Sequence, residues 1–170
     1  MAKTQKRVWF EEAVHSYEPQ LRRYLQRWVS QELAQEIVQE SFVKLWQAGE
    51  SSVGHKVKEW LFCVCRNQAF DHLRRESRMS QLGSKQSDQI DDPENRPDRQ
   101  IEAGQDRVHL TRLLESLTMQ EKEVIRLKFQ EGLSYKQIAD ITGHTVSYVG
   151  VLIHEGLKKI KEKRGAYEKQ

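Results

Sequence analysis

The sequence has no long apolar run, and this absence limits where the protein can act. No segment approaches the roughly 20 consecutive apolar residues that a membrane-spanning helix needs. Residues 1–10 also lack the apolar core of a signal peptide. We therefore expect a cytoplasmic protein that does not insert into membranes.

Cysteine, proline and glycine are scarce: the 170-residue chain has two, three and nine of them. Cys63 and Cys65 are two residues apart in a helical pattern, so their side chains point to well-separated sides. Neither a mutual disulfide nor a shared metal site is expected from this spacing. No run alternates apolar and polar residues as a half-buried strand does. The sequence therefore predicts an all-α protein without strands.

Net charge is small as well, at +3, and does not by itself indicate a nucleic-acid partner. Its distribution is more informative, because two mildly basic blocks flank an acidic middle of low apolar content. Pro93 and Pro97 interrupt any helix in that middle, which cannot bury enough surface to fold alone. We predict two small helical domains, at residues 5–78 and 107–164, joined by a flexible acidic linker at residues 79–106.

The apolar periodicity predicts three helices in the first domain, at residues 9–28, 33–47 and 57–78, with a break near Pro19 left open. The buried side of the second helix is opposed by a polar strip, which consists of Glu36, Gln39, Glu40 and Val43. Taken alone, such a strip is typical of a solvated surface.

The third helix carries a conventional core stripe from Val57 to Leu73 and an unusual opposite face. That face combines aromatic and basic residues: Trp60, Cys63, Asn67, Phe70, Arg74 and Arg78. Rings can stack on bases and guanidinium groups can hold phosphates, so the mixture is typical of a nucleic-acid surface. Packing against a partner helix explains the same face equally well.

Residues 132–163 show the pattern of a helix-turn-helix. A capping box from Ser134 predicts a helix that begins at Tyr135. Gly143 can adopt the left-handed conformation that ends this helix, and Thr145 can cap the next one. The second helix is predicted to turn five side chains inward: Val149, Leu152, Ile153, Leu157 and Ile160. A DNA-binding motif of this kind places its second helix in the major groove, whereas the alternative is an ordinary antiparallel helix pair.

Signals of catalysis are missing. The six histidines show no metal-ligand spacing supported by acids or thiols, no glycine-rich phosphate loop follows a strand, and no nucleophile motif is present. We therefore expect a protein that is not an enzyme, with no catalytic residues, no metal, no cofactor and no small-molecule substrate.

Three segments in the expected order resemble one family. Residues 33–46, LAQEIVQESFVKLW, resemble the second conserved region of bacterial RNA polymerase sigma factors of the extracytoplasmic-function class. Residues 60–75, WLFCVCRNQAFDHLRR, resemble the promoter-melting helix of that region. Residues 117–163, which include GLSYKQIA, resemble the fourth region. The resemblance implies a promoter-specificity subunit that binds core RNA polymerase and promoter DNA and directs sequence-specific transcription initiation.

The resemblance also assigns roles in the first domain. In this family the acidic strip binds the clamp helices of the largest polymerase subunit, so Glu36, Gln39 and Glu40 are the expected polymerase contacts, with Glu36 in place of the usual aspartate. The loop at about residues 48–56 and the melting helix are expected to read the minus-ten element. The matching helix residues are Trp60, Arg66, Asn67, Phe70, Asp71, Arg74 and Arg75.

The recognition helix departs from the family pattern, because Gly150, Leu152 and Glu155 stand where many relatives carry Lys, Arg and Arg. The groove-facing and backbone-holding set that remains is Ser147, Tyr148, Gly150, Val151, His154, Lys158 and Lys159. Val151 suits a thymine methyl group, and His154 suits a phosphate or a base edge.

A second function class stays open. A free-standing dimeric helix-turn-helix regulator that acts without core polymerase would explain the second domain equally well, but not the strip or the aromatic-basic helix. A helical adaptor that binds only proteins is a third alternative. The sequence leaves open the promoter, the inducing signal, the oligomeric state and whether an anti-sigma factor binds the chain.

Overall fold

The computed structural model describes residues 2–81 and 111–167, and all regular secondary structure in these two ranges is helical. The chain divides into two compact units between Glu94 and Asn95, a position outside the described residues. The predicted all-α class is therefore confirmed. The predicted linker lies outside the described residues, apart from its first three positions, of which Met79 and Ser80 belong to a helix. Among the described helices, none is long and apolar enough to cross a membrane.

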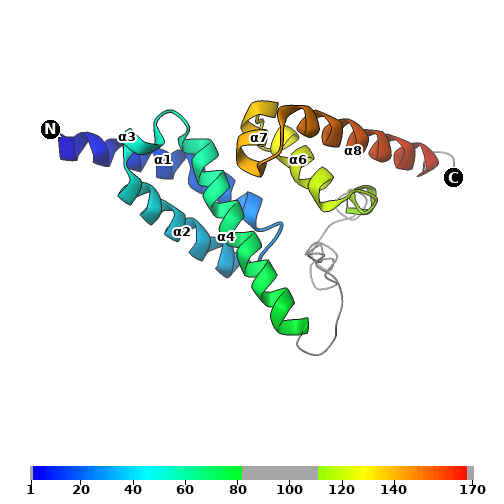
Figure 1. Cartoon of the computed structure of the whole chain (residues 1–170), viewed down its shortest axis with the longest axis horizontal. Helices are drawn as coiled ribbons and strands as arrows, with labels where there is room; N and C mark the ends of the chain where they lie inside the picture. Colours follow the sequence, from blue (N-terminus) through cyan, green and yellow to red (C-terminus); the bar gives the residue numbers. More distant parts are fainter. Residues whose placement is uncertain (1, 82–110, 168–170) are drawn as a thin grey trace. The chain divides into compact units, whose positions relative to one another are not determined.

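The N-terminal unit consists of α1 (Ala2–Leu25), α2 (Gln31–Ala48), the short α3 (Glu50–Val53) and α4 (Val57–Ser80), as Figure 1 shows. Helices α1, α2 and α4 pack against one another. Aromatic rings occupy the centre of this core: the Tyr24 and Phe62 ring centroids are 5.3 Å apart, and those of Trp28 and Phe70 are 5.5 Å apart. The burial of several large rings in a unit of this size is a major part of its hydrophobic stabilisation.

Helix α1 differs from its prediction, because it begins seven residues earlier and continues through Pro19. Proline removes one backbone hydrogen bond from a helix. The Pro19 side is exposed here, so water can solvate the backbone carbonyl that loses its partner. The predicted loop at residues 48–56 also differs, since it contains α3. Gly49 and Gly54 bracket this helix at φ +76° and +62°, values that favour glycine.

Helix α2 matches its prediction closely. Ser30 caps it by accepting a hydrogen bond from Leu33 N at 3.3 Å. Its buried side comprises Ala34, Ile37, Val38, Ser41, Phe42 and Leu45. The polar strip therefore lies on the opposite, exposed side.

The C-terminal unit contains α6 (Met119–Phe129), α7 (Tyr135–Thr142) and α8 (Val146–Tyr167). Helix α7 begins at Tyr135 with the predicted capping box and ends at Gly143 in the left-handed conformation, φ +76°. Thr145 Oγ1 accepts from Tyr148 N at 3.1 Å and so caps α8, also as predicted. A second capping box, at Thr118, begins α6. These local signals produce the helix-turn-helix.

One inward position of α8 was predicted wrongly. Val149, Leu152 and Ile153 are buried, but Leu157 is 41% exposed. Gly156 takes the place next to α6 instead, since a Cβ atom built there would lie 2.5 Å from Ile125 Cδ1 and 3.5 Å from Glu121 Cβ. The absent side chain lets α8 approach α6 closely, which turns Leu157 away from the core.

Candidate nucleic-acid and protein interfaces

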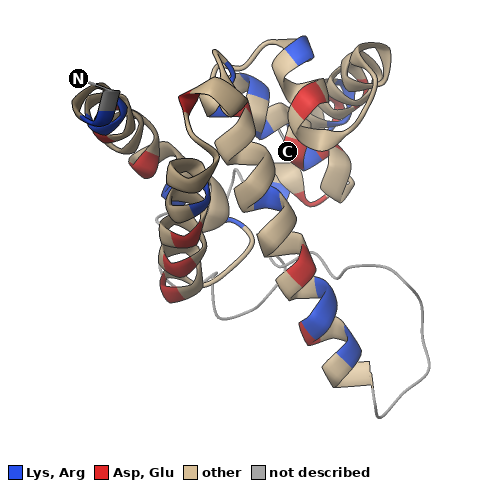
Figure 2. Cartoon of the chain, turned by 60° about the vertical axis from the view of Figure 1, so that its left-hand side comes forward, with Lys and Arg blue, Asp and Glu red and all other residues tan. Residues whose placement is uncertain are grey.

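The polar strip of α2 is a continuous exposed surface. Glu36, Gln39 and Glu40 are all exposed, and Val43 extends the strip with a side chain that is 55% exposed. Figure 2 shows the acidic residues of α2 one above another along the helix. Carboxylates in such a row can form charge-assisted hydrogen bonds with cationic side chains of a partner protein.

The polar positions of α4 form the second surface. Asn67, Asp71, Arg74 and Arg75 are exposed, while Trp60 and Arg66 are half-buried. Arg74 Nη1 lies 3.6 Å from Asp71 Oδ1, so these two side chains orient each other on the surface. Figure 2 shows that both signs of charge occur along the last turns of α4. The structure thus places most of the predicted melting residues on one accessible helix.

Phe70 is an exception, and its placement on an exposed face was wrong. The side chain is only 6% exposed and packs on the Trp28 ring, with Arg66 above its own ring at 4.6 Å from the centroid. The projection of α4 assumed one buried stripe. Because α4 packs against both α1 and α2, its buried arc is wider and includes Phe62 and Phe70. Phe70 is therefore a core residue, and the face of its ring contacts the Arg66 guanidinium group.

The two cysteines occupy different environments, as their spacing predicted. Cys63 is half-buried on the α4 surface, where Asn67 Nδ2 lies 3.7 Å from its Sγ atom. Cys65 is fully buried and donates to Ser41 Oγ at 3.2 Å. Burial raises the pKa of the Cys65 thiol to about 12, so this group stays protonated and unreactive.

The recognition helix α8 presents a weakly charged surface. Ser147, Tyr148, Val151, His154 and Lys158 are exposed, as the groove-facing role requires. The Tyr148 hydroxyl donates to Gln120 Oε1 at 3.2 Å, and its ring meets His144 edge-on at 5.1 Å between centroids. These contacts hold the Tyr148 side chain in one position beside the turn.

Lys159 is engaged within the fold. Its Nζ atom donates to both carboxylate oxygens of Glu121, at 2.8 and 3.0 Å, and that carboxylate also caps α6 by accepting from Thr118 N at 2.8 Å. Burial raises the pKa of Glu121, but the hydrogen bonds from Lys159 and Thr118 outweigh burial, so the pKa is lowered overall. Lys159 therefore fastens α8 to α6, a role that sequence reasoning missed.

Two further residues adjoin the recognition surface and were also missed. The Tyr135 ring, 39% exposed, covers Gly150, where a Cβ atom would lie 3.5 Å from Tyr135 Cε2. Lys128 Nζ lies over the Tyr135 ring, 5.3 Å from the ring centroid. Only the position of Tyr135 at the start of its helix hinted at this arrangement, because the packing on Gly150 joins residues from two helices.

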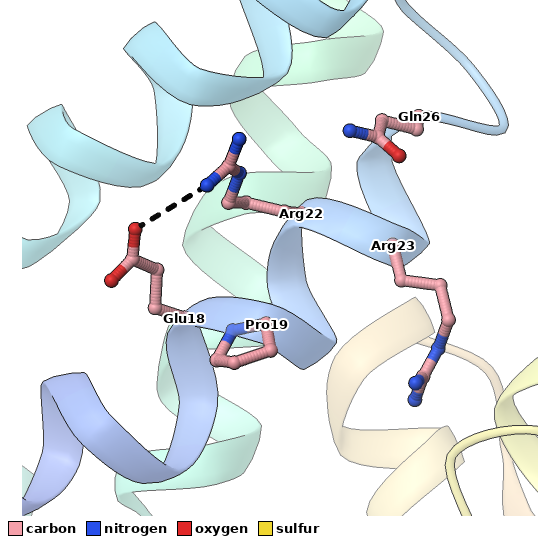
Figure 3. A pocket seen from close by; sticks show the side chains of 5 residues that line it. All are labelled: Glu18, Pro19, Arg22, Arg23 and Gln26. Carbon is pink, nitrogen blue, oxygen red and sulfur yellow. Dashed lines mark ion pairs between the residues drawn. The ribbon is translucent and has the colours of Figure 1, made fainter.

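The hollow beside α1 is shallow and has the character of a surface feature. It encloses about 370 Å³ and is lined by Glu18, Pro19, Arg22, Arg23 and Gln26 (Figure 3). Glu18 Oε1 and Arg22 Nη1 lie 3.8 Å apart across it. All five residues come from one helix and the turn that follows it, so the hollow does not gather chemical groups from several elements. Within the described ranges, no three metal-binding side chains converge.

Comparison with known proteins decides what these surfaces belong to. Residues 13–79 match the family model of sigma-70 region 2, and residues 107–160 match that of sigma-70 region 4. The chain belongs to the sigma-70 family, in its extracytoplasmic-function class. The two matches account for both units of this sigma factor, in the order that the sequence resemblance predicted.

Several curated sigma factors are similar over most of their length. CarQ of Myxococcus xanthus is 26% identical over 161 residues, which cover 94% of this chain and 91% of CarQ. YlaC of Bacillus subtilis is 25% identical and covers 89% and 90%. The extracytoplasmic-function sigma factor SigK of Mycolicibacterium vanbaalenii is 25% identical and covers 76% and 67%.

The fold of this sigma factor also has a solved counterpart. It is similar to the sigma factor RpoE of Bartonella quintana, solved in complex with the anti-sigma factor NepR, at a TM-score of 0.67 and 23% identity. The likeness covers 90% of this chain and 94% of that one, and at this identity it concerns the fold alone.

Proposed function

We propose that this sigma factor is a dissociable promoter-specificity subunit that binds core RNA polymerase and directs initiation, without catalysis of its own. The observation that carries the proposal is the presence of both sigma-70 regions, each with a distinct exposed surface. A free-standing regulator would need only the helix-turn-helix. It would have no use for the acidic row on α2 or the polar face of α4.

The first assigned role is polymerase binding by Glu36, Gln39 and Glu40. Their exposure along one side of α2 supports this role, because an approaching helix of the polymerase clamp can reach all three without rearrangement of the unit. Val43 provides an apolar contact next to the carboxylates. The combination of charged and apolar groups suits a reversible protein interface.

The second role is minus-ten recognition and melting by α4 and the segment before it. The set that we carry forward is Trp60, Arg66, Asn67, Asp71, Arg74 and Arg75. Phe70 is left out because its ring is buried. Arg66 and Arg74 can hold phosphates of the opened strand, and Trp60 retains enough exposure for contact with a base. A flipped base costs a few kcal/mol of lost stacking, which such contacts must offset.

The third role is minus-thirty-five recognition by α8. We assign it to Ser147, Tyr148, Gly150, Val151, His154 and Lys158, and we assign Lys159 to the fold. Because few cationic groups face the groove, backbone contacts contribute little affinity, and the free sigma factor is expected to bind promoter DNA weakly. Core polymerase then supplies the missing affinity by holding both units on the promoter at once.

A further proposed partner is an anti-sigma factor. The support comes from the RpoE chain, which is similar in fold and was solved bound to NepR. Such a partner would act by covering the surfaces that bind polymerase or DNA.

The decisive experiment is run-off transcription with core polymerase, compared with core binding by fluorescence anisotropy. The variant Glu36→Lys with Glu40→Lys should lose core binding and transcription while keeping its helical content, because exposed positions tolerate such changes. Glu11→Lys with Glu12→Lys is the matched control, since both residues are exposed on α1 and the charge change is the same. Wild-type core affinity in the α2 variant would refute the interface. Tight promoter binding and regulation without polymerase would favour the free-standing regulator.

A further inference from the structure

The side chain of Gln68 joins the two functional helices of the N-terminal unit. It projects from α4 and is half-buried against α2. With its amide oriented to suit both neighbours, Nε2 donates to Glu40 Oε2 at 2.8 Å and Oε1 accepts from Lys44 Nζ at 3.1 Å. The opposite orientation would place oxygen against carboxylate and nitrogen against ammonium, so the hydrogen-bonding groups themselves select this one.

The position of Gln68 matters because Glu40 and Lys44 are four residues apart on one helix. A glutamate followed by a lysine at this spacing normally forms an ion pair across one turn. Both side chains lie within the described part of the chain, and no ion pair joins them there. Each instead uses the amide of Gln68, which stands between them.

A buried network supports Gln68 from below. Ser41 Oγ accepts from Cys65 Sγ at 3.2 Å, and its single hydroxyl hydrogen faces two acceptors, Ile37 O at 2.7 Å and, in this orientation of the amide, Gln68 Oε1 at 3.2 Å. Ser41 and Cys65 are both fully buried, so water does not compete for these bonds. The network fixes how α4 lies against α2 at this point and so fixes where the Gln68 amide can reach.

We propose that Gln68 is a positioning residue that keeps Glu40 and Lys44 apart and so preserves the negative charge that Glu40 offers to core polymerase. This inference rests on the proposed polymerase role of the α2 strip. A neutral amide leaves the Glu40 carboxylate its full charge, with one oxygen held in place. A lysine paired with the same carboxylate would cancel that charge and compete with a polymerase cation for it.

The proposal predicts a specific rescue. Gln68→Met keeps the length of the side chain but removes both polar atoms, so Lys44 becomes free to pair with Glu40. An exposed ion pair of this kind is worth about 0.2–1 kcal/mol, which corresponds to a loss of core affinity of roughly 1.4- to fivefold. Adding Lys44→Gln to the same chain removes the competitor and should restore the wild-type affinity.

The experiment measures the affinity of the full chain for core polymerase at fixed, low salt. The chains compared are wild type, Gln68→Met, Gln68→Met with Lys44→Gln, and the exposed-glutamine control Gln5→Ala. Loss in the single variant and recovery in the double variant support the proposal. Unchanged affinity in Gln68→Met overturns it, and so does an equal loss in both variants, which would indicate a purely structural effect.

Glu40→Gln separates this proposal from the proposed function. If Glu40→Gln weakens core binding but Gln68→Met does not, only the role of Gln68 is overturned. If Glu40→Gln binds core like wild type, the polymerase assignment of Glu40 falls, and the role of Gln68 falls with it. A crystal structure of Gln68→Met gives a readout without polymerase, because Lys44 Nζ should then lie within about 4 Å of a Glu40 carboxylate oxygen.

Discussion

The contact between Glu121 and Lys159 predicts how the C-terminal unit responds to loss of one charge. Lys159→Met keeps the aliphatic stem of the side chain but removes the ammonium group. Glu121 then keeps its bond from Thr118 N but loses two charge-assisted bonds, in a site where its side chain is only 6% exposed. The variant therefore leaves a largely buried carboxylate short of partners.

The size of the effect follows from the burial of the two groups. A hydrogen bond to a charged group contributes about 1.5–3 kcal/mol, and loss of one partner exposes the other to its desolvation cost. The Lys159 side chain is 37% exposed, so solvent already screens part of the attraction and can hydrate Glu121 in the variant. We therefore expect a loss of about 1–2 kcal/mol in the free energy of unfolding. In a domain of this size each kcal/mol lowers the melting temperature by roughly 4–8 °C.

The distribution of tryptophan makes the assay selective. All four tryptophans, at positions 9, 28, 46 and 60, lie in the N-terminal unit. Tryptophan fluorescence therefore follows that unit alone, whereas far-UV circular dichroism follows the helices of both. Lys159→Met should lower the melting temperature of the C-terminal unit in the dichroism signal and leave the melting temperature measured by fluorescence unchanged. The neighbouring Lys158→Met serves as the control, because Lys158 is exposed. Equal melting of wild type and Lys159→Met, or an equal loss in the control, would refute the reasoning.

Three further predictions use the same two signals. The lowered pKa of Glu121 means that its stabilising contribution is full above the ordinary carboxylate pKa and is lost as the pH falls through the lowered value. Lys159→Met removes the bond that lowers this pKa most, so the loss of stability that the variant shows by dichroism should be largest near neutral pH and should shrink as the pH falls below the ordinary carboxylate pKa. Gly143→Ala should lower the free energy of unfolding of the C-terminal unit by about 1–2 kcal/mol, because φ is +76° at this position. Gly165→Ala, a helical position in open space on α8, should raise the free energy of unfolding by up to about 1 kcal/mol. A Gly143→Ala chain as stable as wild type would contradict the left-handed turn. Phe70→Ala should lower the free energy of unfolding of the N-terminal unit, followed by tryptophan fluorescence, by about 3–5 kcal/mol. An unchanged free energy of unfolding would show that the ring is not part of the core.

Local signals in the sequence predicted the helices well. These signals act over one or two turns, so α2 lies close to where its apolar period places it, and α7 lies where its capping box and left-handed glycine place it. The first helix was predicted less well, because proline is a strong local signal of interruption. On the exposed side of α1 the cost is small enough for the rest of the helix to continue past Pro19.

The same reasoning predicted the candidate surfaces only in part. It placed Glu36, Gln39 and Glu40 on an exposed strip and Asn67 and Arg74 on an exposed helix face, and the structure agrees with that exposure. Their binding roles remain predictions. Phe70 was misplaced because a helical projection shows which residues share a face but not how many neighbouring helices cover it.

By itself, then, the sequence determined the all-α class, the caps of α7 and the N-cap of α8, and the exposed row on α2, since each depends on residues within a few positions of one another. Only the tertiary structure decided the partners of long polar side chains. Glu121 binds Lys159, which is 38 positions away in the sequence, and Gln68 on α4 binds Glu40 on the neighbouring helix α2. The physical reason is that a flexible charged or amide side chain has several possible partners along its own helix. The packing of the helices determines which of these partners lies within hydrogen-bonding distance.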